Sequence, residues 1–161
     1  MASALRLADA LFTDECSHRM DPIATTGQRS LAALLAGMQP QRQPGEYAFV
    51  VVPEGAALPP AALGSFREAE GLTAIVPLEV AESLGWPAAL RAVWIVLRVH
   101  SSLEATGFTA AFSTALGEAG IACNVIAAVH HDHLFVPTAQ AEDAMAVLQA
   151  LQGRALAGSA R

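Results

Sequence analysis

The chain contains no lysine, and its nine basic residues are all arginines scattered along the sequence. The absence of lysine excludes a Schiff-base nucleophile and the lysine of a phosphate-binding loop. The net charge is −6, and no arginine-rich stripe is present. A nucleic-acid-binding surface needs clustered positive charge to neutralise phosphates, so we expect no nucleic-acid partner.

The chain also lacks a long apolar run, and it has only two cysteines, Cys16 and Cys123. A membrane-spanning helix needs about 18 or more uninterrupted apolar residues, so we expect no membrane association. The first sixteen residues are not typical of a signal peptide, because Asp9, Asp14 and Glu15 interrupt them. Two isolated cysteines without metal or redox spacing are typical of a reduced protein, which favours a cytoplasmic location.

Aromatic residues make up only 6% of the chain, whereas 53% of it is hydrophobic and 15% charged. This composition is that of a compact globular protein whose packing relies on small aliphatic side chains. The length of 161 residues allows one ordinary domain, or two small ones of about 60–80 residues that share a core. Residues 1–29 differ from the rest and form an extension, unless Met20 is the true start.

The hydrophobic pattern predicts a short helix over residues 31–38, then strands over 46–52, 64–70 and 72–76, and a helix over 78–84. From residue 92 the pattern is strand, helix, strand, strand, helix, over 92–99, 108–119, 121–129, 133–136 and 139–151. This order fits two copies of a split β-α-β plan, the first of them eroded. The strand over 92–99 can complete the first copy, begin the second, or do both.

Four segments resemble standalone tandem ACT-domain proteins of bacteria, which are similar to the regulatory domains of aspartate kinases and, more distantly, to cellular arginine sensors. They are GEYAFVV at 45–51, FREAEGLTAIVPLEVAESLGW at 66–86, VHSSLEATGFTAAFSTALGEAGIACNV at 99–125 and HHDHLFVP at 130–137. The resemblance implies an α+β fold of two ferredoxin-like (βαββαβ) halves, with antiparallel sheets and helices on one face. It places a degenerate first half over residues 30–90 and a second over 91–152. The small residues that follow predict a disordered tail over 153–161.

The resemblance further implies an amino acid or similar small molecule as ligand, bound where two ACT units meet. The two halves or two subunits would pair side by side, and we expect a homodimer. Pairing would use an edge strand or a helix face. The implied site consists of the loop and helix start that follow the strand over 92–99, together with the beginning of the next strand. Its residues are His100, Ser101, Ser102, Leu103, Glu104, Thr106, Gly107, Phe108, Cys123 and Asn124.

The residue types in this loop allow two interpretations. The hydroxyls and the helix N-terminus suit a carboxylate, and Glu104 could hold an α-amino group. Alternatively, Ser102 or Thr106 caps the helix and Glu104 complements its dipole. Asn124 either reaches the ligand, pairs across a strand edge, or is a satisfied buried amide, while Cys123 is typical of a small core residue.

Four consecutive residues, His130, His131, Asp132 and His133, could form a secondary site or bind a metal. Adjacent residues of a strand point to opposite faces, so only His131 with His133, or His130 with Asp132, could share a side. The alternative is a polar turn in which Asp132 bonds the backbone and His133 packs against the helices.

No nucleophile motif, dinucleotide fingerprint or phosphate-binding loop is present, so we expect neither an enzyme nor a cofactor. The sequence therefore favours a non-catalytic regulatory module. The alternatives are a metal-dependent enzyme that uses His100 and the 130–133 cluster, or a protein-interaction adaptor whose ligand pocket has decayed.

Overall fold

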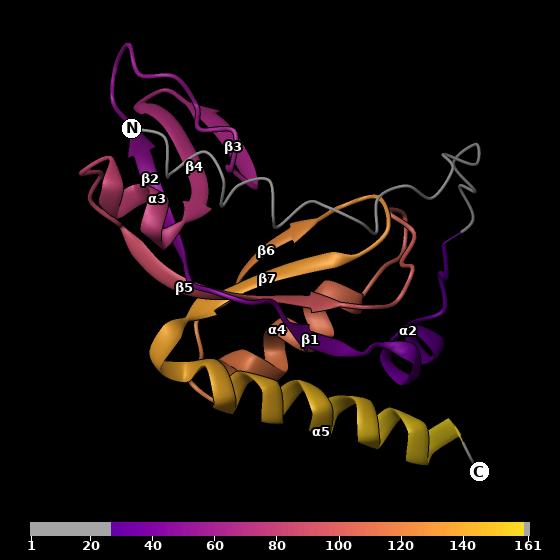
Figure 1. The fold of residues 1–161 in the computed structure, drawn as a ribbon. Helices are drawn as coiled ribbons and strands as arrows, with labels where there is room; N and C mark the ends of the chain where they lie inside the picture. The colour runs from indigo at the N-terminus through magenta and orange to yellow at the C-terminus, as the bar shows by residue number, and fades with distance from the viewer. Residues whose placement is uncertain (1–26, 160–161) are drawn as a thin grey trace.

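The computed structural model describes residues 27–159, which form one antiparallel sheet with helices on one of its faces (Figure 1). The predicted extension over residues 1–29 lies outside the described residues except for Gly27, Gln28 and Arg29. In chain order the elements are α2 (Leu31–Gly37), β1 (Pro40–Arg42), β2 (Tyr47–Val52), β3 (Gly64–Glu68), β4 (Gly71–Pro77), α3 (Leu78–Ser83), β5 (Leu90–Leu97), α4 (Phe108–Glu118), β6 (Asn124–Ala127), β7 (Asp132–Pro137), the 3-10 helix η1 (Thr138–Gln140) and α5 (Ala141–Ser159).

Within the described residues the sheet has seven strands in the order β3-β4-β2-β5-β7-β6, with β1 paired to β5. Strand β5 belongs to both halves of the molecule. Its first residues, Leu90 to Ala92, pair with β2, and the stretch from Ala92 to Leu97 pairs with β7. The ambiguity in the sequence is thus resolved, because this strand completes the first half and begins the second.

The second half also receives a strand from the beginning of the chain. Strand β1 pairs with the end of β5, opposite β7, and supplies the fourth strand that a ferredoxin-like unit requires. Helix α2 accompanies it, since Leu34 and Met38 are fully buried in the same core cluster as α4 and α5. This differs from the predicted boundary, which assigns residues 30–90 to the first half.

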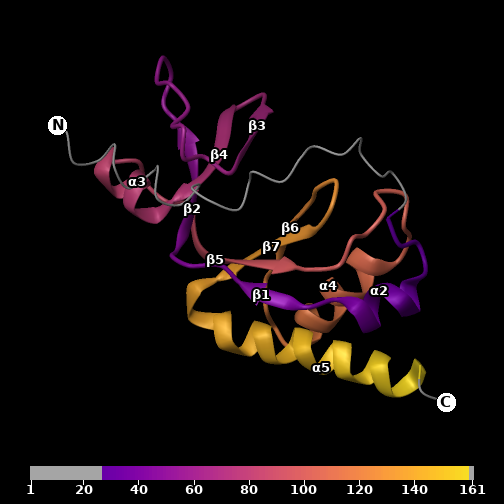
Figure 2. The same ribbon diagram turned by 45° about the vertical axis from the view of Figure 1, so that its right-hand side comes forward.

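Three helices cover one face of the second half, as the rotated view shows (Figure 2). Alternate residues of the strands point toward them, among them Val93, Ile95 and Leu97 of β5, which are fully buried. Short helix α3 covers the corresponding face of β2 and β4 through Ala81. A ferredoxin-like α+β fold with helices on one face is therefore confirmed.

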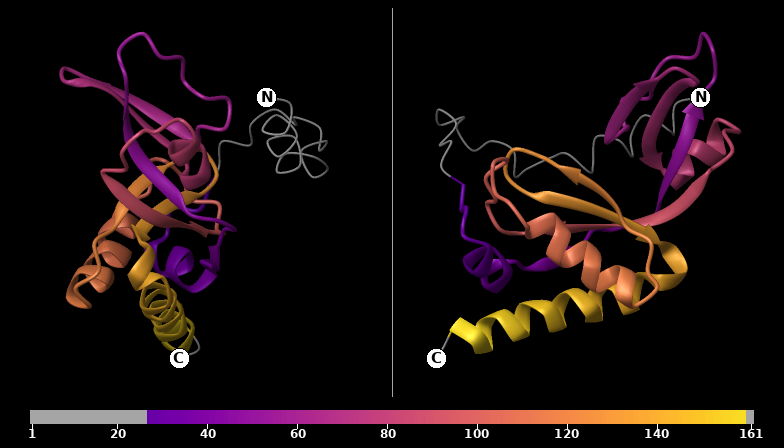
Figure 3. Two further views of the ribbon diagram at one scale, coloured as in Figure 1. Left: turned by 60° about the vertical axis from the view of Figure 1, so that its left-hand side comes forward. Right: turned by 180° about the vertical axis from the view of Figure 1, so that it is seen from behind.

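The opposite face carries no helix in the described part of the chain. It holds an aromatic cluster formed by Tyr47, Trp94 and Phe135, whose ring centroids lie 5.6–6.4 Å apart. Strands β2, β3 and β4 bend away from the hairpin of β6 and β7, so the sheet is strongly curved (Figure 3).

The prediction of a disordered tail from residue 153 is wrong up to residue 159, because α5 continues through Gly153 to Ser159. Gln152 donates a hydrogen bond from Nε2 to the carbonyl oxygen of Ala36 at 3.4 Å, which joins this turn of α5 to α2. The following residues, RALAG, include good helix formers that extend the helix beyond the packed part.

Candidate ligand-binding site

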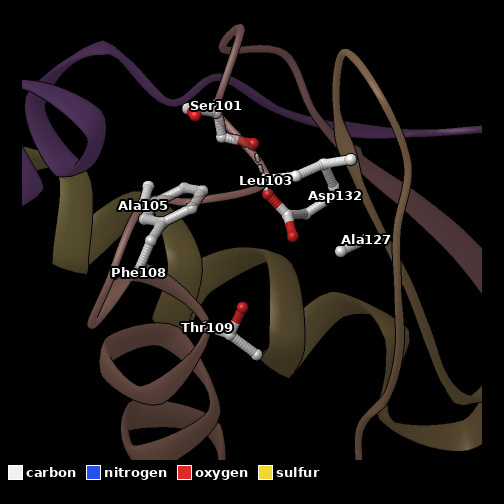
Figure 4. Close-up of a pocket in the computed structure, with 8 residues that line it drawn as sticks. Ser101, Leu103, Ala105, Phe108, Thr109, Ala127 and Asp132 are labelled. Carbon is white, nitrogen blue, oxygen red and sulfur yellow. Dashed lines mark hydrogen bonds between the residues drawn. The ribbon is translucent and has the colours of Figure 1, made fainter. Parts of the chain in front are cut away.

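A small pocket lies where the loop after β5, the start of α4 and the hairpin of β6 and β7 meet (Figure 4). The space that the centre of a water molecule can occupy in it is about 50 Å3, and all of its empty space, open solvent included, is about 300 Å3. The first volume exceeds the space that one water molecule needs, and it lies well below the volumes of drug-sized ligand sites. The lining residues are Ser101, Ser102, Leu103, Ala105, Phe108, Thr109, Ala127 and Asp132.

Asp132 is the charged residue of this lining, and the residue is 3% exposed. One carboxylate oxygen accepts a hydrogen bond from Ser101 Oγ at 2.9 Å. The other points into the space bounded by Phe108, Thr109 and Ala127 (Figure 4). In the described residues no arginine pairs with this carboxylate.

Burial raises the pKa of Asp132 above its ordinary value of 3.8, because a carboxylate away from water loses solvation. The hydrogen bond from Ser101 and the nearby imidazoles of His133 and His131 lower the pKa in part. A buried carboxylate without an ionic partner is costly for the fold, and a bound cation would relieve that cost.

Helix α4 presents its N-terminus to the same pocket. Its N-cap is Gly107 with a φ of 87°, a left-handed conformation that favours glycine, and no side chain caps the helix. The backbone N–H groups of the first turn therefore remain available to an anion, and Phe108 and Thr109 of that turn line the pocket. The pocket thus contains a carboxylate that suits an ammonium group and a helix N-terminus that suits a carboxylate, which are the two charged groups of a zwitterion.

The capping interpretation of the loop differs from what the structure contains. Ser102 Oγ accepts a hydrogen bond from the backbone N–H of Glu104 at 3.2 Å rather than from α4. The Glu104 carboxylate forms an exposed ion pair with Arg29 at 2.6 Å. Glu104 is therefore engaged at the rim, and Asp132 is the carboxylate inside the pocket.

The structure brings together part of the predicted site. Ser101, Ser102, Leu103 and Phe108 line the pocket, whereas His100, Glu104, Thr106, Gly107, Cys123 and Asn124 do not. Asn124 is exposed on edge strand β6, and Cys123 is half-buried beside the core. Burial raises the pKa of the Cys123 thiol to about 11, so the thiol is protonated at neutral pH.

Sequence reasoning missed Ala105, Thr109 and Ala127 and assigned Asp132 to a turn or a metal. The alternation of side chains along the strand could have shown that Asp132 is buried. As the first residue of β7 it shares a face with Leu134 and Val136, which point toward the helices. A carboxylate on that face has to be buried.

The histidines around Asp132 point in different directions. His131 Nδ1 donates to the Val99 carbonyl oxygen at 3.2 Å, whereas His133 Nδ1 accepts from Trp94 Nε1 at 3.1 Å on the helix-free face. The rings of His100 and His130 meet edge to face with centroids 5.1 Å apart. Among residues 27–159, no group of three or more His, Cys, Asp or Glu side chains is arranged to hold a metal ion.

No helix in the described part of the chain has both the length and the hydropathy needed to cross a bilayer.

Two models of the ACT domain match this sequence in tandem, one over residues 26–92 and one over residues 90–150. Their junction falls at the start of β5, the strand that both halves share. ACT domains commonly bind amino acids and act in regulation.

Among solved structures, a protein of unknown function from Vibrio cholerae, described as a possible transport protein, is 40% identical. The match covers 79% of this chain and 99% of that chain, with a TM-score of 0.67. A protein from Agrobacterium tumefaciens is 18% identical over 71% of this chain and 89% of that chain, and its TM-score of 0.53 shows a shared fold alone. No curated protein matches significantly. The paired domain matches and the relative from Vibrio cholerae together establish that this chain belongs to the ACT-domain family, as a protein of two ACT domains in tandem.

Proposed function

We propose that this protein is a non-catalytic sensor that binds a small amino acid in the pocket between Ser101 and Asp132. The observation that carries this proposal is the pairing of a buried carboxylate with an uncapped helix N-terminus across one space. An ammonium group would bind the inward oxygen of Asp132, and a carboxylate would bind the N–H groups at the start of α4.

The dimensions of the pocket limit the ligand class. The space of about 50 Å3 that is open to the centres of water molecules is far below that of drug-sized ligand sites, which limits the ligand to a small molecule. Phe108 and Ala105 provide apolar walls, which favour a small neutral side chain over a charged one. Glycine, alanine and serine are the amino acids that best fit this description.

The proposal is tested by thermal unfolding of the purified full-length chain against each of the twenty amino acids, with and without EDTA. A ligand present at 100 times its Kd adds about 2.7 kcal/mol to the free energy of unfolding. For a domain of this size that is a rise of roughly 5–10 °C in Tm. We expect a rise with a small neutral amino acid that EDTA does not change.

The absence of any shift across the panel would refute amino-acid sensing. Co-purification of one partner protein without a ligand response would then favour an interaction adaptor. A large loss of stability in EDTA would instead favour the metal-dependent alternative at the histidines.

We further propose that the protein works as a homodimer in the cytoplasm, paired through edge strand β6. The two ends of the sheet differ in charge: β3 carries Arg67 and Glu68, whereas β6, with the sequence NVIA, has neither a charge nor a proline. Charged residues protect a free edge from pairing, so β6 is the edge that can accept a second copy. Ala127, at the end of β6, lines the pocket and would place it beside the interface.

Size-exclusion chromatography with light scattering tests the pairing. Asn124→Lys puts a charge on the exposed edge of β6 and is expected to give a monomer. The matched control is Ser65→Lys, an exposed position on β3 at the other end of the sheet, which should leave a dimer intact. A dimer in both variants would exclude β6 as the interface.

A further inference from the structure

Residues 27–29 form a short strap along the loop that lines the pocket. The backbone N–H of Gln28 donates to the carbonyl oxygen of His100 at 2.8 Å, and the N–H of Ser102 donates to the carbonyl oxygen of Gln28 at 3.1 Å. These two bonds form a parallel bridge between Gln28 and Ser101. The strap therefore fixes the backbone on both sides of Ser101.

Gly27 allows this approach because it has no side chain. A Cβ atom at this position would lie 2.5 Å from Ser102 N and 2.7 Å from the Ser101 carbonyl carbon. Both are backbone atoms, which cannot turn aside as a flexible side chain would. The requirement for glycine at this position comes from close contact with the loop and not from an unusual φ.

The strap is anchored at its other end to the folded core. Gln28 Oε1 accepts hydrogen bonds from the backbone N–H groups of Arg29 and Ser30, each at 2.8 Å, and this joins the strap to the start of α2. Helix α2 is held by the fully buried Leu34. The ion pair between Arg29 and Glu104 connects the strap to the middle of the loop.

Ser101 is consequently held from two directions. Its backbone neighbours are bonded to Gln28, and its hydroxyl donates to the buried carboxylate of Asp132. A displacement of the strap would move Ser101 and weaken that hydrogen bond.

We propose that Gly27 and Gln28 are positioning residues of the pocket, which hold Ser101 where its hydroxyl orients the Asp132 carboxylate toward the ligand. The effect on ligand affinity rests on the proposed function, whereas the effect on Ser101 and Asp132 does not. Gly27→Ala would push the strap off the loop and leave the sheet and its helices in place.

The test compares Gly27→Ala and Gln28→Ala with Gly117→Ala in the full-length protein. Gly117 is a matched control because it lies in α4 and a Cβ there meets nothing within 4 Å. Three readouts are used: hydrogen exchange of the Ser102 amide, the carboxyl titration of Asp132 by NMR, and the affinity for L-alanine by calorimetry. A purely structural role of the strap would lower the global stability without moving the Asp132 titration.

For Gly27→Ala we expect at least tenfold faster exchange at Ser102, an upward shift of the Asp132 midpoint and about tenfold weaker binding of L-alanine. Gln28→Ala, at an exposed position, removes the side-chain hydrogen bonds to Arg29 and Ser30 and should change the three readouts in the same direction. This variant tests the role of the strap if Gly27→Ala does not fold. Unchanged exchange and titration in a folded variant would overturn the proposal. If the unmodified protein does not bind L-alanine, that result counts against alanine as the ligand, and the two ligand-free readouts still decide the role of the strap.

Discussion

The substitution Asp132→Asn removes the charge of the pocket and keeps its shape. The asparagine oxygen can still accept the hydrogen bond from Ser101, which is 2.9 Å long in the structure. A hydrogen bond between an ammonium group and a carboxylate contributes about 1.5–3 kcal/mol. We therefore expect the affinity for a small amino acid to fall by roughly 10- to 150-fold.

The same substitution should stabilise the ligand-free protein. Because burial raises the pKa of Asp132, the folded state binds this proton more tightly than the unfolded chain does. The stability of the unmodified protein then falls as the pH rises from the ordinary value of 3.8 through the raised pKa, and the loss is complete above it. Asparagine does not ionise, so the variant is free of this loss at neutral pH.

Calorimetry measures the affinity, and urea unfolding between pH 3.5 and pH 7 measures the stability. The gain in the variant should shrink as the pH falls toward the ordinary pKa. Asp143→Asn, at an exposed position of α5, is the matched control and should change neither quantity appreciably. A variant that binds the amino acid as well as the unmodified protein would refute the ammonium site at Asp132.

Three further predictions concern other parts of the fold. Burial, and to a smaller extent His131, lowers the pKa of His133 below its ordinary value of 6.5, although Asp132 raises it. Its contribution to stability is therefore present above pH 6.5 and lost as the pH falls toward the lower folded pKa, and His133→Gln should flatten this part of the urea-unfolding profile. Phe112→Ala removes a fully buried ring beneath the sheet and should cost about 3–5 kcal/mol by urea unfolding; a cost below about 1 kcal/mol would contradict its place in the core. Gly153→Ala lies inside α5 in open space and should raise the stability by up to about 1 kcal/mol, whereas no change would indicate that the helix ends before it.

The local pattern of apolar residues was enough to predict most helices and strands of this chain. The apolar spacing of Phe108, Phe112 and Leu116 predicted α4 almost to the residue, because a helix repeats its buried face every three to four positions. The β-branched run before Pro53 likewise predicted β2. Strand β1 could not be found, since three residues that begin with a proline carry no periodicity and are extended because they pair with β5.

The candidate site was predicted in part for a similar reason. The family motif and the helix start directed attention to residues 100–108, which are contiguous in sequence. Asp132 was interpreted as a turn residue because the predicted strand began one residue later, at His133, so the alternation of the strand was not applied to it.

The family, the ferredoxin-like α+β class and the absence of lysine-based chemistry could be predicted without the structure, because motifs, composition and local periodicity are properties of the chain alone. Tertiary structure decided which carboxylate is buried, since Glu104 pairs with Arg29 at the surface while Asp132 enters the pocket. It also decided that β5 serves both halves, that β1 and α2 complete the second half, and that Gly27 lies against Ser102. These are contacts between segments distant along the chain, and they depend on how the sheet brings those segments together.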